Sequence, residues 1–207
     1  MRSKNLVART RPRSELLVVR PLRRGVNTEL TSEVVVRHDG LGEGIFDDQR
    51  TYRYRLSRIW DDAAPGVCWV MLNPSTATTG VDDRTISRVI DFSRSWGHGS
   101  ATVVNLFAFR TRQPDRLTQV DDPVGAANDE IILEAVTSTP FVIAAWGNHG
   151  SIVNPATGIP RWKEVHSLLT AAGVELKCLA VTDRGQPGHP LYLRKSVAAT
   201  PFRSVAT

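Results

Sequence analysis

The sequence has few cysteines and no long apolar run. Its two cysteines, Cys68 and Cys178, lie in apolar surroundings without Cys-x-x-Cys spacing, which favours buried free thiols in a reducing compartment over a disulfide or a zinc site. No stretch approaches the ~18 consecutive apolar residues of a transmembrane helix, and the basic N-terminus lacks the apolar segment of a signal peptide. We therefore expect a cytoplasmic protein without membrane contact.

Several catalytic and cofactor signatures are also missing. The stretch 185–188 matches neither the Gly-x-Gly-x-x-Gly nor the P-loop pattern that cradles phosphates, and no Ser-His-Asp nucleophile elbow is present. His38, His98 and His166 have no acidic or cysteine neighbours that converge on a metal site. The sequence therefore predicts no cofactor and no metal.

Length and charge indicate one domain and a polyanionic partner. The chain has 207 residues, of which 41% are hydrophobic, enough for a sizeable core. A net charge of +5 favours a polyanionic partner. We interpret residues 1–33 as a basic N-terminal arm, which either contacts phosphates or is a solvated, partly disordered tail with a short strand at 16–19, and residues 34–207 as the folded domain.

From Tyr52 onward, predicted strands and helices alternate, as a βαβ sheet requires. Tyr52, Tyr54 and Leu56 alternate with polar residues, which predicts a half-buried strand, and 40–48 is predicted to be a loop. Apolar runs predict buried strands at 68–72, 102–107, 141–147 and 176–182; helices are predicted at 83–96, over about ten residues capped by Asn128, and at 162–172. We predict an α/β fold, a three-layer sandwich whose central, mostly parallel sheet carries helices on both faces.

Three of these strands, those at 68–72, 102–107 and 141–147, end in polar groups, and the loop 185–190 is expected to lie beside them. Ligands in open α/β sheets bind beyond the carboxyl ends of strands, so Asn73, Asn105 and His189 are expected to line one pocket. Asn105 is the most informative, because its amide lies in a run of Val, Leu and Phe where an unpaired polar group costs about 1–3 kcal/mol. Structural roles stay open: Asn73 as a turn cap, Asn105 as a tie to a neighbouring loop, and His149 and His189 as core or loop-capping histidines.

Taken in order, these segments resemble a known family. The segments Leu72-Asn73-Pro74-Ser75, Asn105-Leu106-Phe107-Ala108-Phe109-Arg110, Ala145-Trp146-Gly147 and His189-Pro190-Leu191-Tyr192 are similar to domain-of-unknown-function family 1643 of bacteria and phages, over about 52–202. The same order of motifs resembles the uracil-DNA glycosylase superfamily. This resemblance implies a uracil-DNA-glycosylase-like fold and a monofunctional DNA glycosylase that flips its target nucleotide out of the duplex.

The resemblance also implies roles for individual residues. Asn73 would position the attacking water, Asn105 would read the base, and His189 would stabilise the departing base, with Asp82 or Asp83 recruited because an amide is a poor base. The rest of the base pocket would consist of Leu72, Pro74, Ser75, Phe107, Trp146 and His149. DNA would be contacted by Arg110, Arg112, Leu191, Tyr192, Arg194 and Lys195, with 191–193 as an apolar wedge.

Ser75 stands where uracil-specific relatives have a tyrosine that excludes substituents on carbon 5 of the base. The resemblance therefore implies a modified pyrimidine, such as a hydroxymethylated or glucosylated cytosine in phage DNA, and a role in antiviral defence. We expect a monomer that acts on double-stranded DNA. Two other functions stay open: a catalytically weak nucleic-acid-binding module of the same fold, and an enzyme that processes nucleosides or nucleotides.

Overall fold

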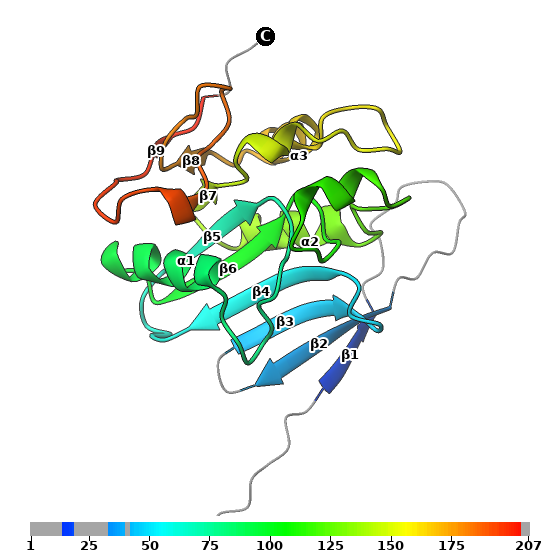
Figure 1. Cartoon of the computed structure of the whole chain (residues 1–207). Coiled ribbons are helices and arrows are strands. Elements are labelled where there is room, and N and C mark those ends of the chain that lie inside the picture. Colours follow the sequence, from blue (N-terminus) through cyan, green and yellow to red (C-terminus); the bar gives the residue numbers. More distant parts are fainter. Residues whose placement is uncertain (1–13, 19–32, 40–41, 204–207) are drawn as a thin grey trace, which may run out of the picture.

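The computed structural model describes residues 14–18, 33–39 and 42–203 (Figure 1). The chain adopts an α/β fold around one mixed, nine-stranded sheet with the strand order β1-β2-β3-β4-β6-β5-β7-β8-β9. The strands are β1 (Ser14–Val18), β2 (Glu33–Asp39), β3 (Gly42–Asp47), β4 (Arg53–Ile59), β5 (Gly66–Met71), β6 (Ser100–Asn105), β7 (Val142–Ala144), β8 (Leu176–Cys178) and β9 (Thr200–Pro201). The helices are α1 (Arg84–Ser95), α2 (Asn128–Thr137) and α3 (Arg161–Ala171), and three 3-10 turns are η1 (Pro114–Thr118), η2 (Asn148–Ser151) and η3 (Pro190–Tyr192). Apart from β1 and Glu33, the first residue of β2, the predicted basic arm lies outside the described residues.

Parallel pairing is confined to the centre of the sheet. Strands β6, β5, β7 and β8 pair in parallel, whereas β1 to β4 form an antiparallel meander that joins β6, and β9 is antiparallel to β8. The prediction of a mostly parallel sheet is therefore wrong for the sheet as a whole. The physical reason is connection length, because β2, β3 and β4 follow one another through connections too short for a parallel crossover.

Strand β3 occupies the stretch that the sequence predicts as a loop. Its glycines suggest a loop, yet in the structure they allow close contact within the sheet: a Cβ at Gly42 would lie 2.0 Å from the Ser57 carbonyl oxygen, and one at Gly44 would lie 2.6 Å from the Phe46 ring. Glycine in a strand interior often marks such a close approach. The loop prediction was wrong because the glycines satisfy sheet packing.

Helices cover both faces of the central strands (Figure 1). Along β5, Trp69 and Met71 pack with α1, whereas Cys68 and Val70 pack in a second cluster with α2 and α3. This alternation on a strand buried on both faces explains its unbroken apolar sequence. Cys68 and Cys178 are buried free thiols, as predicted, and burial raises the pKa of Cys68 to about 12.

Strand β4 contains a β-bulge. Ile45 of β3 pairs with Arg55 and the next residue, Phe46, pairs with Arg53, so Tyr54 is an extra residue on β4. The sequence alternation predicts Tyr54 and Leu56 on one face, but Tyr54 packs with Ile131 of α2 and Leu56 packs with the α1 cluster. A bulge shifts the alternation of side chains by one residue and redirects those that precede it.

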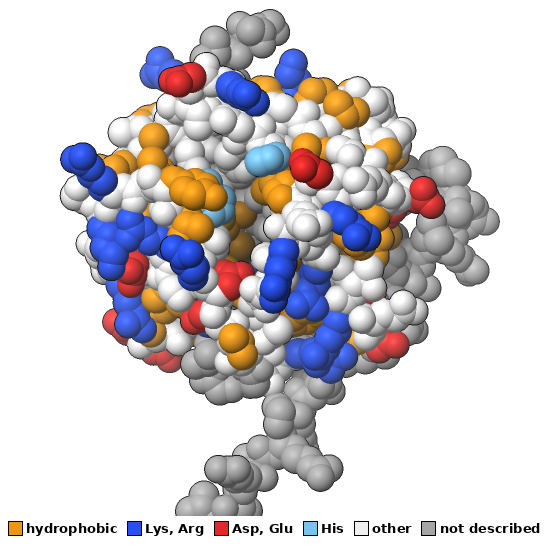
Figure 2. Space-filling model, viewed as in Figure 1, with side chains coloured by type: hydrophobic (Ala, Val, Ile, Leu, Met, Phe, Trp, Pro, Cys, Tyr) orange, Lys and Arg blue, Asp and Glu red, His pale blue; other side chains and the backbone are white. Residues whose placement is uncertain are grey.

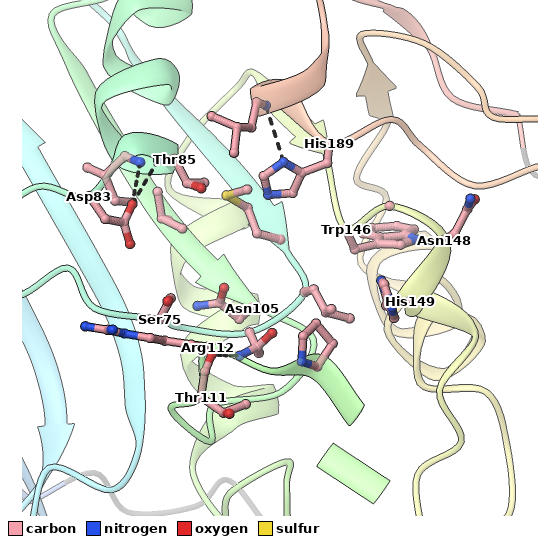
Figure 3. Close-up of a pocket in the computed structure, with 18 of the residues that line it drawn as sticks. Ser75, Asp83, Thr85, Asn105, Thr111, Arg112, Trp146, Asn148, His149 and His189 are labelled. Atoms are coloured by element: carbon pink, nitrogen blue, oxygen red, sulfur yellow. Dashed lines mark hydrogen bonds between the residues drawn. The ribbon is translucent and has the colours of Figure 1, made fainter. Parts of the chain in front are cut away.

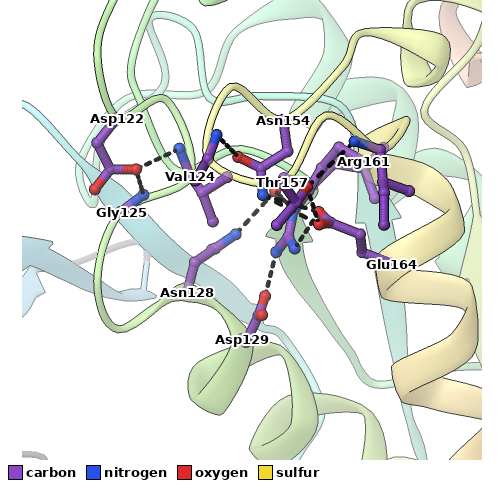
Figure 4. Close-up of polar contacts among 12 residues, drawn as sticks. Asp122, Val124, Gly125, Asn128, Asp129, Asn154, Thr157, Arg161 and Glu164 are labelled. Carbon is purple, nitrogen blue, oxygen red and sulfur yellow. Dashed lines mark hydrogen bonds and ion pairs between the residues drawn. The ribbon is translucent and has the colours of Figure 1, made fainter.

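The carboxyl end of β6 is held by polar side chains from α2 and α3 (Figure 4). Asn128 was predicted to cap α2, but it is the first helical residue, and its Nδ2 donates at 3.0 Å to the backbone carbonyls of Asn105 and Leu106. Arg161 donates through Nε to the Leu106 carbonyl at 2.9 Å and pairs with Asp129 and Glu164. These contacts fix the strand end that carries the Asn105 side chain.

Candidate functional site

A cavity of about 530 Å³ lies beyond the carboxyl ends of β5, β6 and β7 (Figure 3). The N-terminus of α1 forms one side of it, and the segments that begin at Trp146 and His189 form another. Its volume falls within the range typical of small-molecule sites. Figure 2 shows a hollow on this face of the molecule, with histidine side chains at its rim and basic side chains nearby.

Most of the predicted site residues line this cavity. They are Leu72, Asn73, Ser75, Asp83, Asn105, Arg112, Trp146, His149, His189, Leu191 and Tyr192. The predicted residues Asp82, Pro74, Phe107, Arg110, Arg194 and Lys195 are not part of the lining. The cavity thus brings together Asn73, Asn105 and His189, the three polar residues that were expected to line one pocket.

Asn105 presents a buried amide nitrogen that has no hydrogen-bond partner among the described residues. Its side chain is 1% exposed, and its Nδ2 makes no hydrogen bond within the described part of the chain. Leaving such a group unpaired costs free energy that a ligand with a matching acceptor would recover. The predicted alternative, a side-chain tie to a neighbouring loop, is not what the structure contains: the tie is made by the backbone carbonyl of Asn105 to Asn128.

Asn73 has its amide group fixed in one orientation. Its Nδ2 donates to the backbone carbonyls of Pro74 at 2.9 Å and Thr111 at 2.8 Å. Because both partners can only accept, the amino group must face them, and Oδ1 remains as the free acceptor of this side chain. Asn73 therefore secures the turn and also lines the cavity.

His189 is neutral and has a defined tautomer. Burial lowers the pKa of His189 to about 4, although the nearby negative charge of Asp83 opposes part of this effect. The backbone N–H of Leu191 donates to Nδ1 at 3.3 Å, so the single proton of the neutral ring is on Nε2 (Figure 3). His189 thus carries an N–H donor that has no hydrogen-bond partner among the described residues.

The two candidate carboxylates have different surroundings. Asp83 is the N-cap of α1, where one oxygen accepts from the N–H groups of Thr85 and Ile86 and the other accepts from Ala77 N–H at 3.3 Å. It lies at the cavity wall. Asp82 instead forms an ion pair with the buried Arg58 at 2.8 Å and lies outside the lining, which leaves Asp83 as the carboxylate of the site.

The Trp146 wall is held by hydrogen bonds between loops. Trp146 Nε1 donates to Oε1 of the buried Gln186 at 2.8 Å, and Gly147 N–H donates to the Pro187 carbonyl at 2.9 Å. Gly150 packs against the Trp146 ring, where a Cβ would lie 2.2 Å from Cδ1. Sequence reasoning missed Gln186, although a buried tryptophan requires an acceptor for its indole N–H.

The predicted DNA-contacting residues occupy three different settings. Arg112 is exposed at the cavity, and Arg110 lies in an adjoining groove with Arg50, to whose carbonyl it donates at 3.0 Å. Burial lowers the pKa of Arg110. Lys195 forms an ion pair with Asp91 at 2.6 Å.

The predicted apolar wedge at 191–193 is only partly available. Leu193 packs against the α1 cluster, whereas Tyr192 is 83% exposed. Leu191 lines the cavity beside it. Tyr192 is therefore the member of this segment that extends into solvent.

Sequence reasoning also missed Arg53, which lines the cavity and is 2% exposed. Burial lowers the pKa of its guanidinium to about 9.

Within the described ranges, no group of three or more His, Cys, Asp or Glu side chains is placed to hold a metal, and no helix is long and apolar enough to cross a membrane.

Comparison with known proteins gives one match. A family model described as a protein of unknown function, DUF1643, matches residues 53–191. This range includes every cavity-lining residue except Tyr192. No curated protein and no solved structure matches the chain.

Proposed function

The chain belongs to the DUF1643 family, and we propose that it is a monofunctional DNA glycosylase that hydrolyses the N-glycosidic bond of a flipped-out, modified pyrimidine. The observation that carries this proposal is a pair of donors in one cavity that no described residue accepts from, the buried amide of Asn105 and the Nε2–H of neutral His189. The Asn105 amide is suited to recognising the base, and the His189 N–H is suited to stabilising the base anion. We also propose that the chain has a three-layer fold of the uracil-DNA-glycosylase type.

Asn105 is suited to recognising a base edge. A primary amide offers a donor and an acceptor side by side, which can pair with the acceptor and donor of a pyrimidine edge. The tie between its backbone carbonyl and Asn128 holds the strand end in place, so little ordering is needed when the base enters. In this role Asn105 contributes both affinity and discrimination.

His189 is suited to stabilising the leaving base. As the C1′–N bond breaks, its electron pair moves onto the base, and negative charge develops on the ring carbonyl oxygen. A neutral imidazole that donates from Nε2 stabilises this charge, and the hydrogen bond strengthens as the charge grows. Because His189 is neutral well above its pKa of about 4, this donor is available without prior protonation.

Asn73 and Asp83 would serve the attacking water. The Asn73 Oδ1, oriented by the two bonds of its amino group, accepts a hydrogen bond from the water. The water oxygen forms the new bond to C1′, and its proton passes to Asp83 or to solvent. An amide is a poor base, so this mechanism relies on an oxocarbenium-like transition state in which bond breaking precedes attack.

Double-stranded DNA is the proposed partner. Arg50, Arg110 and Arg112 surround the groove that adjoins the cavity and would neutralise backbone phosphates, and exposed Tyr192 would occupy the position of the removed base. Ser75 is small and leaves room for a substituent on carbon 5. Excision of hypermodified bases from phage DNA would give the protein a role in antiviral defence.

The test uses duplex oligonucleotides that differ in one base. Purified protein is incubated with duplexes that contain cytosine, uracil, 5-hydroxymethylcytosine or its glucosylated form, and abasic sites are detected by alkaline cleavage. We expect abasic sites with a modified base, their loss in His189→Ala and Asn105→Ala, and full activity in His38→Ala, which removes an exposed histidine on β2. Absence of product from all four duplexes would refute the proposal.

The same assay separates the alternatives. Duplex binding without product, unchanged by His189→Ala, would indicate a nucleic-acid-binding module. Release of free base from mononucleosides at a rate independent of salt would indicate a nucleoside-processing enzyme, because phosphate contacts make DNA binding strongly salt-dependent.

A further inference from the structure

Arg53 differs from the other buried arginines of the described core. Among the residues that the structure describes, three arginines are buried: Arg53, Arg58 and Arg161. Arg58 pairs with Asp82 at 2.8 Å, and Arg161 pairs with Asp129 and Glu164. No carboxylate of the described residues lies within 4.0 Å of the Arg53 guanidinium, although Asp83 is near enough to affect its pKa. A buried charge without a direct counterion is rare, because desolvation strongly disfavours it.

The bonds that Arg53 makes use only part of its guanidinium. Its Nη1 donates to the Ala77 carbonyl at 2.9 Å, while Nε is buried without a partner and Nη2 has no hydrogen-bond partner among the described residues. The side chain borders the cavity that also contains Asn105 and His189. A planar guanidinium with free N–H groups matches an oxyanion, which can accept two parallel hydrogen bonds.

The β-bulge accounts for the position of Arg53. Without the extra residue Tyr54, strict alternation would place Arg53 on the same face as Arg55, whose guanidinium pairs with Glu134 of α2. With the bulge, Arg53 reaches the opposite face, where it meets Ala77 and the cavity. Bulges often redirect a side chain beside a functional site.

We propose that Arg53 binds an anionic group, a phosphate or a carboxylate, on the molecule that occupies the cavity. This anion is the missing counterion of the buried guanidinium, and binding it would pair Nε and Nη2. The inference rests on the proposed function only for what that molecule is. On a flipped nucleotide, the anion is either the phosphate of that nucleotide or an acidic substituent on carbon 5 of the base.

Two pairs of small probes distinguish these sources. Calorimetric titration compares uridine 5′-monophosphate with uridine, for the phosphate, and 5-carboxyuracil with uracil, for the substituent. We expect the charged member of one pair to bind at least about 10-fold more tightly, the usual effect of a charge-assisted hydrogen bond, and the pair that shows the preference identifies the source. Equal affinities within both pairs, or no binding of any probe at millimolar concentration, would overturn the proposal.

Variants then assign the preference to Arg53. Arg53→Gln should abolish it, and Arg53→Lys should retain part of it, since lysine keeps the charge but loses the planar fork. Arg94→Gln, which removes an exposed arginine of α1, is the matched control and should leave it unchanged. A preference that persists in Arg53→Gln would overturn the assignment.

Thermal unfolding distinguishes anion binding from a purely structural role. If Arg53 served only to hold the Ala77 carbonyl, Arg53→Met would unfold at a lower temperature without ligand, and the anionic probe would not stabilise the wild-type protein. We expect the opposite: unliganded Arg53→Met is at least as stable as wild type, because it no longer buries an unpaired charge, and stabilisation by the probe is lost.

The outcomes also separate this inference from the proposed hydrolysis. A preference for the anionic probe without abasic sites in any duplex would leave the Arg53 site in place and refute the glycosylase. Abasic sites in DNA with neutral modified bases, without any anion preference, would refute the role of Arg53 alone.

Discussion

Replacing His189 with asparagine tests whether a neutral imidazole stabilises the leaving base. An asparagine Oδ1 can take the place of Nδ1 and accept from Leu191 N–H, a bond of 3.3 Å in the native protein, but the variant has no donor at the position of Nε2. The loop should therefore keep its structure while the cavity loses one donor. Removal of one donor to a developing oxyanion costs about 2.7–4 kcal/mol, or about 10²–10³ in rate.

Single-turnover excision from a modified duplex measures this loss at the chemical step. We expect His189→Asn to be slower by about 10²-fold or more with DNA affinity nearly unchanged, and His189→Gln to recover part of the rate, because its amide nitrogen reaches farther toward the Nε2 position. An asparagine variant with wild-type single-turnover rates would refute the role of the Nε2 donor.

The pH dependence provides a second check on the same residue. Because burial lowers the pKa of His189 to about 4, its charge should not change between about pH 5.5 and 8, and the chemical rate should show no step attributable to it. A rate that falls as pH rises through about 6.5 would mean that the imidazolium is the active form, contrary to our reasoning.

Protonation of His189 should also make the folded protein less stable at acidic pH. The unfolded chain binds a proton at His189 below about pH 6.5, whereas the native protein resists protonation down to about pH 4, so the free energy of unfolding should decrease as pH falls through this interval. The contribution is up to about 1.4 kcal/mol per pH unit. Chemical denaturation at several pH values should show a smaller decrease for His189→Asn.

Four further predictions concern other parts of the molecule. Asn105→Leu should weaken binding of the modified duplex by about 1–3 kcal/mol without lowering the free energy of unfolding, since it removes an unpaired buried amide; a loss of stability in urea denaturation would contradict this. Ser75→Tyr should block excision of a carbon-5-substituted base while far-UV circular dichroism and melting stay unchanged, and undiminished single-turnover activity would rule out the open pocket. Arg161→Ala should lower the free energy of unfolding by about 1–3 kcal/mol, because the buried Leu106 carbonyl loses a donor and the partly exposed carboxylates of Asp129 and Glu164 lose their cation, and a change below about 0.5 kcal/mol would show that the network is dispensable. Deletion of residues 1–13 removes arginines and a lysine but keeps β1. In a plot of the logarithm of the DNA-binding constant against the logarithm of salt concentration, the slope should become shallower by about one unit per lost phosphate contact. An unchanged slope would assign the arm to the solvated-tail alternative.

The parts of the fold that follow from local sequence were predictable. The helix that begins after Asp83 has a capping carboxylate, inward-facing Ile86 and Val89, and Gly97 at its end, and the structure has α1 at Arg84–Ser95. The central strands were predictable for a similar reason, since strands covered on both faces need continuous apolar sequence. The positions of Asn73 and Asn105 at their carboxyl ends then follow from the topology.

The remaining features depend on contacts between distant segments. Gly42 and Gly44 look like loop residues until Ser57 and the Phe46 ring lie against them. Asn128 resembles a helix cap, but the carbonyls after β6 compete for its amide. Alternation alone predicts the wrong face for Arg53, because the extra residue in β4 is defined only by its pairing with β3.

The loops around the cavity are bonded to one another as well as to the sheet. Thr111 N–H donates to the Pro74 carbonyl at 2.9 Å while the Asn73 amide donates back to the Thr111 carbonyl, and in the other wall Gly147 N–H donates to the Pro187 carbonyl at 2.9 Å. Each wall is therefore a two-loop unit with interdependent geometry. Efforts to change specificity by exchanging loops with a relative would have to transfer 73–76 together with 109–113, and 146–150 together with 182–189, because a single transplanted loop would lack the matching carbonyl and amide groups of its neighbour.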